Sequence, residues 1–291
     1  GLKMDSILEV NGLVKRYPAF FLDNISFSLP EGCVTGFIGA NGAGKTTTIR
    51  SILNLAHKDA GTIKIFGLDA EEHEKEIKDR IGIIMDGSYF YNDLSMRDMK
   101  SIIAPAYSKW SDADYQSYMD KFDLDPKQKI STLSSGMRMK YALVLALSHQ
   151  AELLIMDEPT SGLDPLVRSQ FLEIIKEYMK NGGKGVFFST HITSDLDKIA
   201  DMLILINGGK IIFQRNKDDL LDTFRTVKGN TTVLNDQNKK LIRGLRVSAF
   251  GFTGITDQVP EIKKEMPDVL LEKATIEDIM LAYIGGDNSD R

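Results

Sequence analysis

A glycine-rich segment at residues 39–46, GANGAGKT, contains the residue types that bind phosphate groups. Glycines allow backbone N–H groups to curve around phosphate oxygens without side chains blocking the approach. The segment follows the apolar run VTGFI and precedes a helical pattern, and a helix N-terminus favours an anion. The full match to GxxxxGK[ST] in this context predicts a nucleoside triphosphate site rather than a connecting turn.

Each residue of this phosphate loop has an expected role. Lys45 would reach the β- and γ-phosphates of ATP, and the Thr46 hydroxyl would ligate Mg²⁺. The residues expected to surround the phosphates are Gly39, Asn41, Gly42, Ala43, Gly44, Lys45, Thr46 and Thr47.

Two adjacent carboxylates, Asp157 and Glu158, follow the apolar run LLIM. Carboxylate oxygens are suitable Mg²⁺ ligands, and a carboxylate can also act as a general base. We expect Asp157 to hold Mg²⁺, directly or through water, and Glu158 to orient and deprotonate the attacking water. The alternative is that the pair only caps a helix that begins near Pro159.

A third segment, LSSGM at residues 133–137, places small polar residues at the start of an apolar helix. No acidic residue lies in the expected first turn, so this helix N-terminus is suited to bind a second anion. Taken alone, the segment is also compatible with a simple serine N-cap.

Together these segments resemble the ATP-binding cassette (ABC) family, the ATPase subunits of ABC transporters. The resemblance covers residues 7 to about 218 and rests on several motifs in order. GANGAGKT is similar to Walker A, LSSGM to the LSGGQ signature and LLIMDE to Walker B. SGLD at residues 161–164 is similar to the D-loop, and His191 in FFSTH to the switch histidine.

The resemblance implies further roles. His191 would contact the γ-phosphate, and two cassettes would dimerise head to tail around ATP, either as a homodimer or as a heterodimer with another ABC ATPase. The signature of one subunit would then act on nucleotide held by the other. The additional nucleotide-contacting residues implied in this way are Tyr17, Ser134, Ser135, Gly136 and Asp164. For Tyr17, expected to stack on adenine, the alternative is ordinary packing.

The sequence departs from the family pattern at three positions. Ser135 replaces a glycine of the signature and Met137 replaces a glutamine. Asp86 aligns with the Q-loop, where glutamine or glutamate is usual and where a contact with Mg²⁺ or the attacking water is implied. Because aspartate is one methylene shorter, direct contact from Asp86 is in question.

The elements that must position these residues alternate between strands and long helices, which predicts a parallel sheet covered on both faces. The resemblance implies an α/β P-loop NTPase with a mixed sheet core, an antiparallel β subdomain and a helical subdomain at about 89–150. We expect the ABC domain at 4–218 and a small αβ accessory subdomain at 219–291. In the latter, GNTTVLN, GLRVSAFGFTG and DVLLEK predict strands and TIEDIMLAYI a helix.

A separate polytopic membrane permease is the partner that the resemblance implies. The sequence is most similar to ATPases of bacterial exporters, among them those that expel antimicrobial or amphipathic peptides. The surface of this chain on which the permease would dock would include a cluster of aromatic residues and methionines. The alternative is that this cluster packs in the interior. The members of this cluster are Tyr89, Phe90, Tyr91, Met96, Met99 and Trp110.

Composition favours a cytosolic protein. The single cysteine, Cys33, cannot form an internal disulfide, and no apolar run approaches the roughly 18 residues of a membrane span. The sequence given does not begin with a basic region followed by an apolar stretch, which is the pattern of a secretion signal. We therefore expect a cytoplasmic protein, and the membrane partner that the resemblance implies would make it peripheral on the inner face of the cell membrane.

Two other functions are compatible with the same motifs. A soluble ABC ATPase acting on nucleic acid or ribosomes is disfavoured by the net charge of −5 and the absence of a long coiled-coil pattern, so we expect no nucleic-acid partner. The basic segment KKLIRGLR at 239–246 is interpreted as a solvated face. A regulatory module without hydrolysis is disfavoured by the presence of Lys45 and Glu158.

Overall fold

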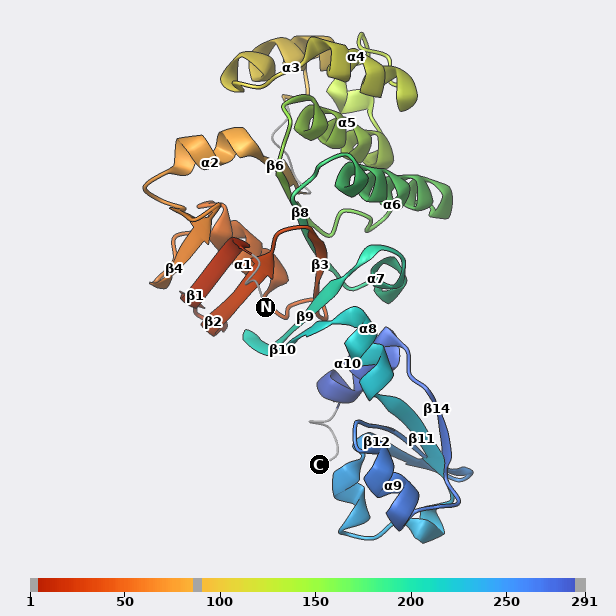
Figure 1. The fold of residues 1–291 in the computed structure, drawn as a ribbon. Coiled ribbons are helices and arrows are strands. Elements are labelled where there is room, and N and C mark those ends of the chain that lie inside the picture. The colour runs from red at the N-terminus through yellow and green to blue at the C-terminus, as the bar shows by residue number, and fades with distance from the viewer. Residues whose placement is uncertain (1–4, 86–90, 286–291) are drawn as a thin grey trace. The chain divides into compact units, whose positions relative to one another are not determined.

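The computed structural model describes residues 5–85 and 91–285, and these divide into two compact units at the boundary between Gln214 and Arg215 (Figure 1). The boundary expected at 218/219 falls inside helix α8 (Lys217–Thr223). Three residues with expected roles, Asp86, Tyr89 and Phe90, lie outside the described residues.

A six-stranded sheet in the order β10-β9-β3-β8-β7-β6 forms the centre of the first unit. Strands β9, β3, β8, β7 and β6 are parallel neighbours, and almost all residues of the inner strands are buried, as in sheets covered on both faces. The bounds are β3 (Cys33–Ile38), β6 (Ile81–Ile84), β7 (Leu153–Asp157), β8 (Gly185–Thr190), β9 (Met202–Asn207) and β10 (Lys210–Asn216). Because parallel strands end at the same edge, the loops after β3, β7 and β8 meet there.

A second, antiparallel sheet has the order β2-β1-β4-β5. Its strands are β1 (Ser6–Tyr17), β2 (Phe20–Pro30), β4 (Ala60–Ile65) and β5 (Leu68–Asp69). In β2 the residues alternate between buried and exposed, which is the pattern of a sheet with one face on the core.

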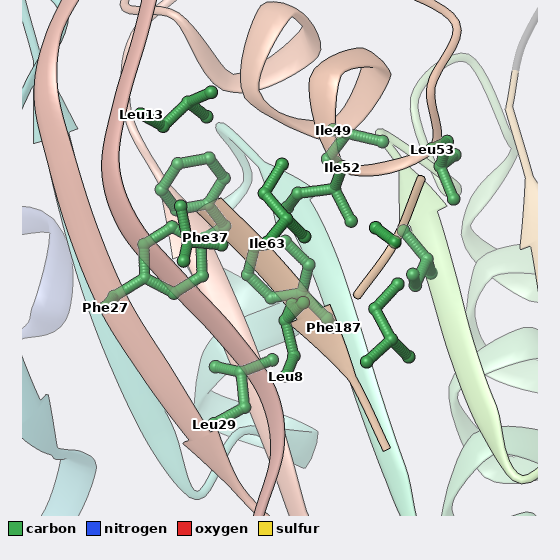
Figure 2. Close-up of a cluster of buried hydrophobic side chains, with 14 of the residues drawn as sticks. Leu8, Leu13, Phe27, Leu29, Phe37, Ile49, Ile52, Leu53, Ile63 and Phe187 are labelled. Carbon is green, nitrogen blue, oxygen red and sulfur yellow. The ribbon is translucent and has the colours of Figure 1, made fainter. Parts of the chain in front are cut away.

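The core between this antiparallel sheet and the central sheet is drawn in Figure 2. The rings of Phe27, Phe37 and Phe187, from β2, β3 and β8, have centroids 5.3 to 5.8 Å apart. Helix α1 (Lys45–Ile52) buries Ile49 and Ile52 in the same cluster. This packing fixes the helix that begins at the end of the phosphate loop.

A helical region follows β6, with α3 (Met96–Ile103), α4 (Asp112–Lys121) and α5 (Ser135–Ser148). Its core contains Met96 and Met99, which are 0% and 2% exposed. The buried Tyr141 hydroxyl donates to the Met96 carbonyl at 2.6 Å and lies 3.1 Å from the Tyr115 hydroxyl. Interior packing is therefore the correct interpretation for these two methionines, and Trp110 also packs on this core, whereas Tyr91 is 63% exposed.

Three further helices complete the first unit: α2 (Glu74–Arg80), α6 (Pro165–Lys180) and α7 (Thr193–Ile199). Helix α6 begins with an aspartate cap, Asp164, and with Pro165 in its first turn, a combination that favours helix initiation. Among the described residues, no helix has the length and apolar content needed to cross a membrane.

The second unit contains a four-stranded antiparallel sheet in the order β12-β13-β11-β14. Its elements are α8, β11 (Arg225–Gly229), β12 (Arg243–Ser248), β13 (Gly251–Thr256), α9 (Val259–Glu265), β14 (Leu270–Lys273) and α10 (Ile276–Ile284). The prediction of a strand at GNTTVLN is wrong, because a 3₁₀ turn at Thr231–Val233 occupies this position. There the Asn230 side chain accepts a hydrogen bond from the Thr232 amide, which favours a turn.

Candidate functional site

The phosphate loop adopts backbone angles that require glycine. Gly42 and Gly44 have φ angles of 83° and 114°, which side-chain-bearing residues rarely adopt. A Cβ atom at Gly39 would lie 2.6 Å from the Ile206 carbonyl oxygen. The loop is also fixed by a hydrogen bond of 3.0 Å from the Gly209 amide to the Ala43 carbonyl. The glycine residues and the contacts with Ile206 and Gly209 thus determine the shape of the loop.

Lys45 turns its ammonium group back over this loop. The side chain is 5% exposed, and Nζ donates to the Gly39 carbonyl and lies 3.4 Å from the Ala40 carbonyl oxygen. Nζ is also 3.0 Å from Oε1 of Glu158. A buried ammonium group so placed is suited to phosphate oxygens.

Asp157 joins the phosphate loop to the end of β8. Its Oδ2 accepts a hydrogen bond from the Thr46 hydroxyl at 2.9 Å, and its Oδ1 accepts one from the Ser189 hydroxyl at 2.5 Å. A hydroxyl and a carboxylate oxygen are hard oxygen donors of the kind Mg²⁺ prefers beside phosphate and water. The residues present therefore fit a magnesium ion held by Thr46 and Asp157.

Glu158 occupies an unusual backbone conformation directly after β7. Its φ angle of 46° is uncommon for a residue other than glycine, and such strain is typical of functional positions. The Glu158 amide donates to the Ser189 hydroxyl at 2.9 Å, which supports this conformation. The carboxylate lies between two partners, with Oε1 near Lys45 and Oε2 2.9 Å from Nδ1 of His191.

The signature segment begins helix α5. Ser134 is the N-cap residue, since its hydroxyl accepts a hydrogen bond from the Met137 amide at 3.2 Å, so the serine-cap interpretation holds for this residue. The first turn contains no acidic residue, which leaves the positive end of the helix unneutralised by its own side chains. A Cβ atom at Gly136 would be 3.2 Å from Val167 on α6, so a larger residue would crowd that helix.

Tyr17 ends β1 with its side chain 45% exposed and Lys15 Nζ 5.2 Å from its ring centroid. This exposure argues against ordinary packing as its role. Asp164 accepts a hydrogen bond from the Val167 amide at 3.0 Å as the cap of α6.

The structure brings together only part of the expected set. Hydrogen bonds and ion pairs connect Gly39, Lys45, Thr46, Asp157, Glu158 and His191 in one cluster. The bonds of Ser134 and Asp164 serve as helix caps, and Asp86 lies outside the described residues.

Sequence reasoning missed Ser189, which contacts both acidic residues of the cluster. The sequence shows only a hydroxyl residue near the end of a mostly apolar segment, and the full burial of Ser189 is seen only in the structure. Buried polar groups generally have a hydrogen-bond partner, so such a serine indicates a polar neighbour.

Sequence reasoning also missed Asp195, which is 1% exposed and lies on α7, four residues after His191. The buried Thr160 hydroxyl donates to its Oδ2, and Arg168 Nε is 3.6 Å from its Oδ1. Burial raises the pKa of Asp195, while Thr160 and Arg168 act in the opposite direction. The residue connects the segment after His191 with the segment after Glu158.

Comparisons with known proteins agree with this geometry. The sequence model of the family described as ABC transporter matches residues 22–161. The bacitracin transport ATP-binding protein BcrA of Bacillus licheniformis is 33% identical over 242 residues, or 82% of this chain and 78% of the relative. The daunorubicin resistance ATP-binding protein DrrA3 of Streptomyces coeruleorubidus is 26% identical over 308 residues, or 97% of each chain. A solved ATP-binding subunit of an ABC transporter, 28% identical, matches with a TM-score of 0.68 over 75% of this chain and 92% of that chain.

Proposed function

This chain belongs to the family of ABC transporter ATP-binding proteins, and we propose that it drives export through a separate membrane subunit by binding and hydrolysing ATP. One observation carries the proposed mechanism: Lys45, Glu158 and His191 form a continuous chain of contacts beside the Thr46–Asp157 hydrogen bond. Cation, general base and metal-binding oxygens therefore meet at the phosphate loop.

Each group in this cluster has a proposed role. Lys45 binds the β- and γ-phosphates, and Thr46 with Asp157 holds Mg²⁺, which when bound offsets negative charge on the phosphates. Glu158 accepts a proton from the attacking water, and His191 orients the Glu158 carboxylate through Oε2 and contacts the γ-phosphate. Ser189 holds Asp157 and the Glu158 backbone in position.

Export of a peptide or amphipathic compound is the transport reaction that we propose. This is supported by the names of the relatives, which include transport of bacitracin, resistance to daunorubicin and export of Nod factor. The membrane subunit would bind the cargo. The ATPase would be bound to that subunit on the cytoplasmic face of the membrane.

Two ATPase subunits, identical or not, are proposed to close around ATP. The positive end of α5 at Ser134, Ser135 and Gly136 would face the γ-phosphate on the partner subunit, with Asp164 at the same interface. A helix N-terminus contributes about 0.3 to 2 kcal/mol toward an anion, depending on burial. The closed dimer would therefore weaken when the γ-phosphate leaves.

For the membrane subunit we propose a docking site in the helical region. A cavity of about 560 Å³ is lined in part by apolar residues of β6, α3 and α5, among them Ile102, Met139 and Leu145, and its lining extends to Ser135 and Glu158. Ile102 is 54% exposed, unlike the buried Met96 and Met99 of the expected cluster. An amphipathic helix of a membrane permease is the occupant suited to this apolar surface.

The variant Glu158→Gln tests the hydrolytic mechanism. We expect ATP hydrolysis to fall by about 10²- to 10⁴-fold, because removing a general base typically has this effect. ATP binding should persist and a stable dimer should accumulate with Mg²⁺ and ATP, measured by light scattering. The control is Glu173→Gln, an exposed glutamate of α6, which should leave hydrolysis unchanged.

Two results would contradict separate parts of this proposal. Undiminished hydrolysis in Glu158→Gln would remove Glu158 from the mechanism. A variant that binds ATP but stays monomeric, even with the membrane subunit present, would contradict the closed dimer.

The variant Ile102→Glu tests the docking site. A charge in an apolar interface is expected to abolish co-purification with the membrane subunit, while ATP hydrolysis by the isolated chain should be retained. Ile212→Glu is the matched control, because Ile212 is a 40% exposed isoleucine on β10, away from the cavity lining. Equal retention of the membrane subunit by both variants would refute this docking site.

A further inference from the structure

Four cationic side chains in the second unit line a single pocket of about 840 Å³. Lys239 and Lys240 lie on the 3₁₀ turn Asn238–Leu241, and Arg243 and Arg246 lie on β12. We call the pocket that these four residues line the basic pocket. They belong to the KKLIRGLR segment, whose expected role was only a solvated face.

A β-bulge places the two arginines on the same face of the sheet. Arg243 pairs with Ile255, and Arg246 pairs with Thr253, so the two residues between them oppose only Gly254. In a regular strand, residues three apart point to opposite faces. Because Ile255 and Thr253 are two apart on β13, the bulge instead directs both arginines to one side.

The bulge is held by close packing against helix α10. Gly244 has a φ angle of 62°, and a Cβ atom there would lie 2.8 Å from Cα of Ala282. Arg243 also stacks over the ring of Tyr283, with its guanidinium carbon 4.2 Å from the centroid. Stacking leaves the edge of a guanidinium group available for bidentate hydrogen bonds.

The two lysines are presented by a turn that a buried side chain fixes. Asn238 is 3% exposed, and its side-chain nitrogen Nδ2 donates a hydrogen bond to the Val233 carbonyl at 2.7 Å. Its side-chain oxygen accepts from the Asn235 amide at 2.7 Å. Lys239 and Lys240 therefore extend from an ordered backbone.

Among the described residues, no ion pair engages any cation of the basic pocket, although Asp257 and Asp278 also line it. The Asp278 carboxylate accepts a hydrogen bond from the Thr275 amide as part of a helix cap. Elsewhere on this sheet, Lys228 pairs with Glu272 at 3.0 Å. The pocket lining thus has four cationic and two acidic side chains, which leaves a net positive charge.

We propose that the basic pocket binds a ligand bearing phosphate groups, with bidentate contacts from Arg243 and Arg246 and added charge from the two lysines. Two guanidinium groups on one face match the several oxygens and multiple charges of phosphate better than a single carboxylate. A soluble phosphorylated compound and a phospholipid headgroup share this chemistry. The inference concerns the second unit and is independent of the ATP site.

The test uses the full-length chain carrying Lys45→Ala, which weakens phosphate binding at the phosphate loop. Pyrophosphate is titrated calorimetrically, and vesicles of phosphatidylcholine with phosphatidylglycerol are assayed by flotation. Replacing both arginines, Arg243→Ala with Arg246→Ala, should weaken binding by about tenfold per arginine. Conversion of both arginines to lysine keeps the charge but removes the bidentate contacts, and should give a smaller loss.

A matched control is Lys263→Ala with Lys264→Ala, which removes the same charge from exposed positions on α9 of the same unit. Circular dichroism shows whether each variant is folded. If the variant with both arginines replaced by alanine does not fold, the variant with both arginines replaced by lysine tests the proposal. Arginine-dependent binding of pyrophosphate identifies a soluble phosphorylated ligand, and arginine-dependent binding of vesicles alone identifies a lipid headgroup. Binding of neither probe, or equal losses in the control, would overturn the proposal.

Discussion

His149 should make the stability of the first unit depend on pH in a specific way. The side chain follows α5, is 2% exposed, and stacks on the Tyr107 ring with centroids 3.8 Å apart. Within the described part of the chain, its Nδ1 atom has no hydrogen-bond partner. Burial lowers the pKa of His149 from 6.5 to about 4, a shift that the nearby Asp79 carboxylate only partly opposes.

The sign of the effect follows from this lowered pKa. Below about pH 6.5 the unfolded chain binds a proton at His149, whereas the folded chain does so only near pH 4, so acid favours unfolding. From about pH 7.5 to about pH 5.5 this linkage removes about 1.3 kcal/mol from the free energy of unfolding. The loss is about 3 kcal/mol at pH 4 and becomes complete only below the folded pKa.

Denaturant unfolding followed by tryptophan fluorescence measures this loss. Trp110 is the sole tryptophan and lies in the same region as His149. Ser111, which follows Trp110, donates its backbone amide to the carbonyl of Ser148, which precedes His149, at 2.8 Å. The variant His149→Phe keeps an aromatic ring against Tyr107 but cannot bind a proton. Comparing the two proteins at each pH cancels the contribution of every other titrating group.

We expect the free energy of unfolding of the wild-type chain to fall by about 1.3 kcal/mol more than that of His149→Phe over this pH range. If the two proteins lose equal stability on acidification, His149 titrates normally in the folded chain and the reasoning from its burial is wrong. His149→Gln provides a second variant without a titrating ring, should the phenylalanine pack poorly.

Two further predictions concern helix α7. Replacing Asp195 with alanine leaves the Thr160 hydroxyl and Arg168 without their acceptor, which should cost about 1 to 3 kcal/mol of stability by denaturant unfolding and slow ATP hydrolysis. Asp195→Asn, which keeps one acceptor, should lose less stability and less activity. If both variants behave like the wild-type chain, Asp195 has no positioning role. At Gly36 a Cβ atom would lie 2.1 Å from a methyl carbon of Leu196, so Gly36→Ala should destabilise the unit by about 1 to 3 kcal/mol. An unchanged unfolding midpoint in that variant would show that Leu196 moves aside freely.

The central part of the site could be predicted because its residues are adjacent in sequence and flanked by clear elements. Gly39 to Thr46 follow β3 and enter α1, and Asp157 ends β7 with Glu158 directly after it, as expected. Ser189 and Asp195 could not be assigned in this way. Their importance comes from contacts with residues 27 to 35 positions distant, which local patterns do not encode.

The second unit shows the same limit. The segments predicted as strands, GLRVSAFGFTG and DVLLEK, lie in β12, β13 and β14, and the predicted helix TIEDIMLAYI is α10, which begins with a capping box of Thr275 and Asp278. Strand β11 was missed because it lies among polar residues, and its pairing with β13 and β14 decides its conformation. The KKLIRGLR segment showed its charge in the sequence, but not that a bulge aligns Arg243 with Arg246.

The amino-acid sequence by itself determined the family, the phosphate loop and the acidic pair, because glycine conformations, apolar strands and helix starts are local properties of the chain. Only the tertiary structure decided that Glu158 lies between Lys45 and His191, and that Met96 and Met99 are interior. These outcomes depend on which parallel strands are neighbours and on how side chains pack between helices. Residues distant in sequence acquire their shared chemistry only through that packing.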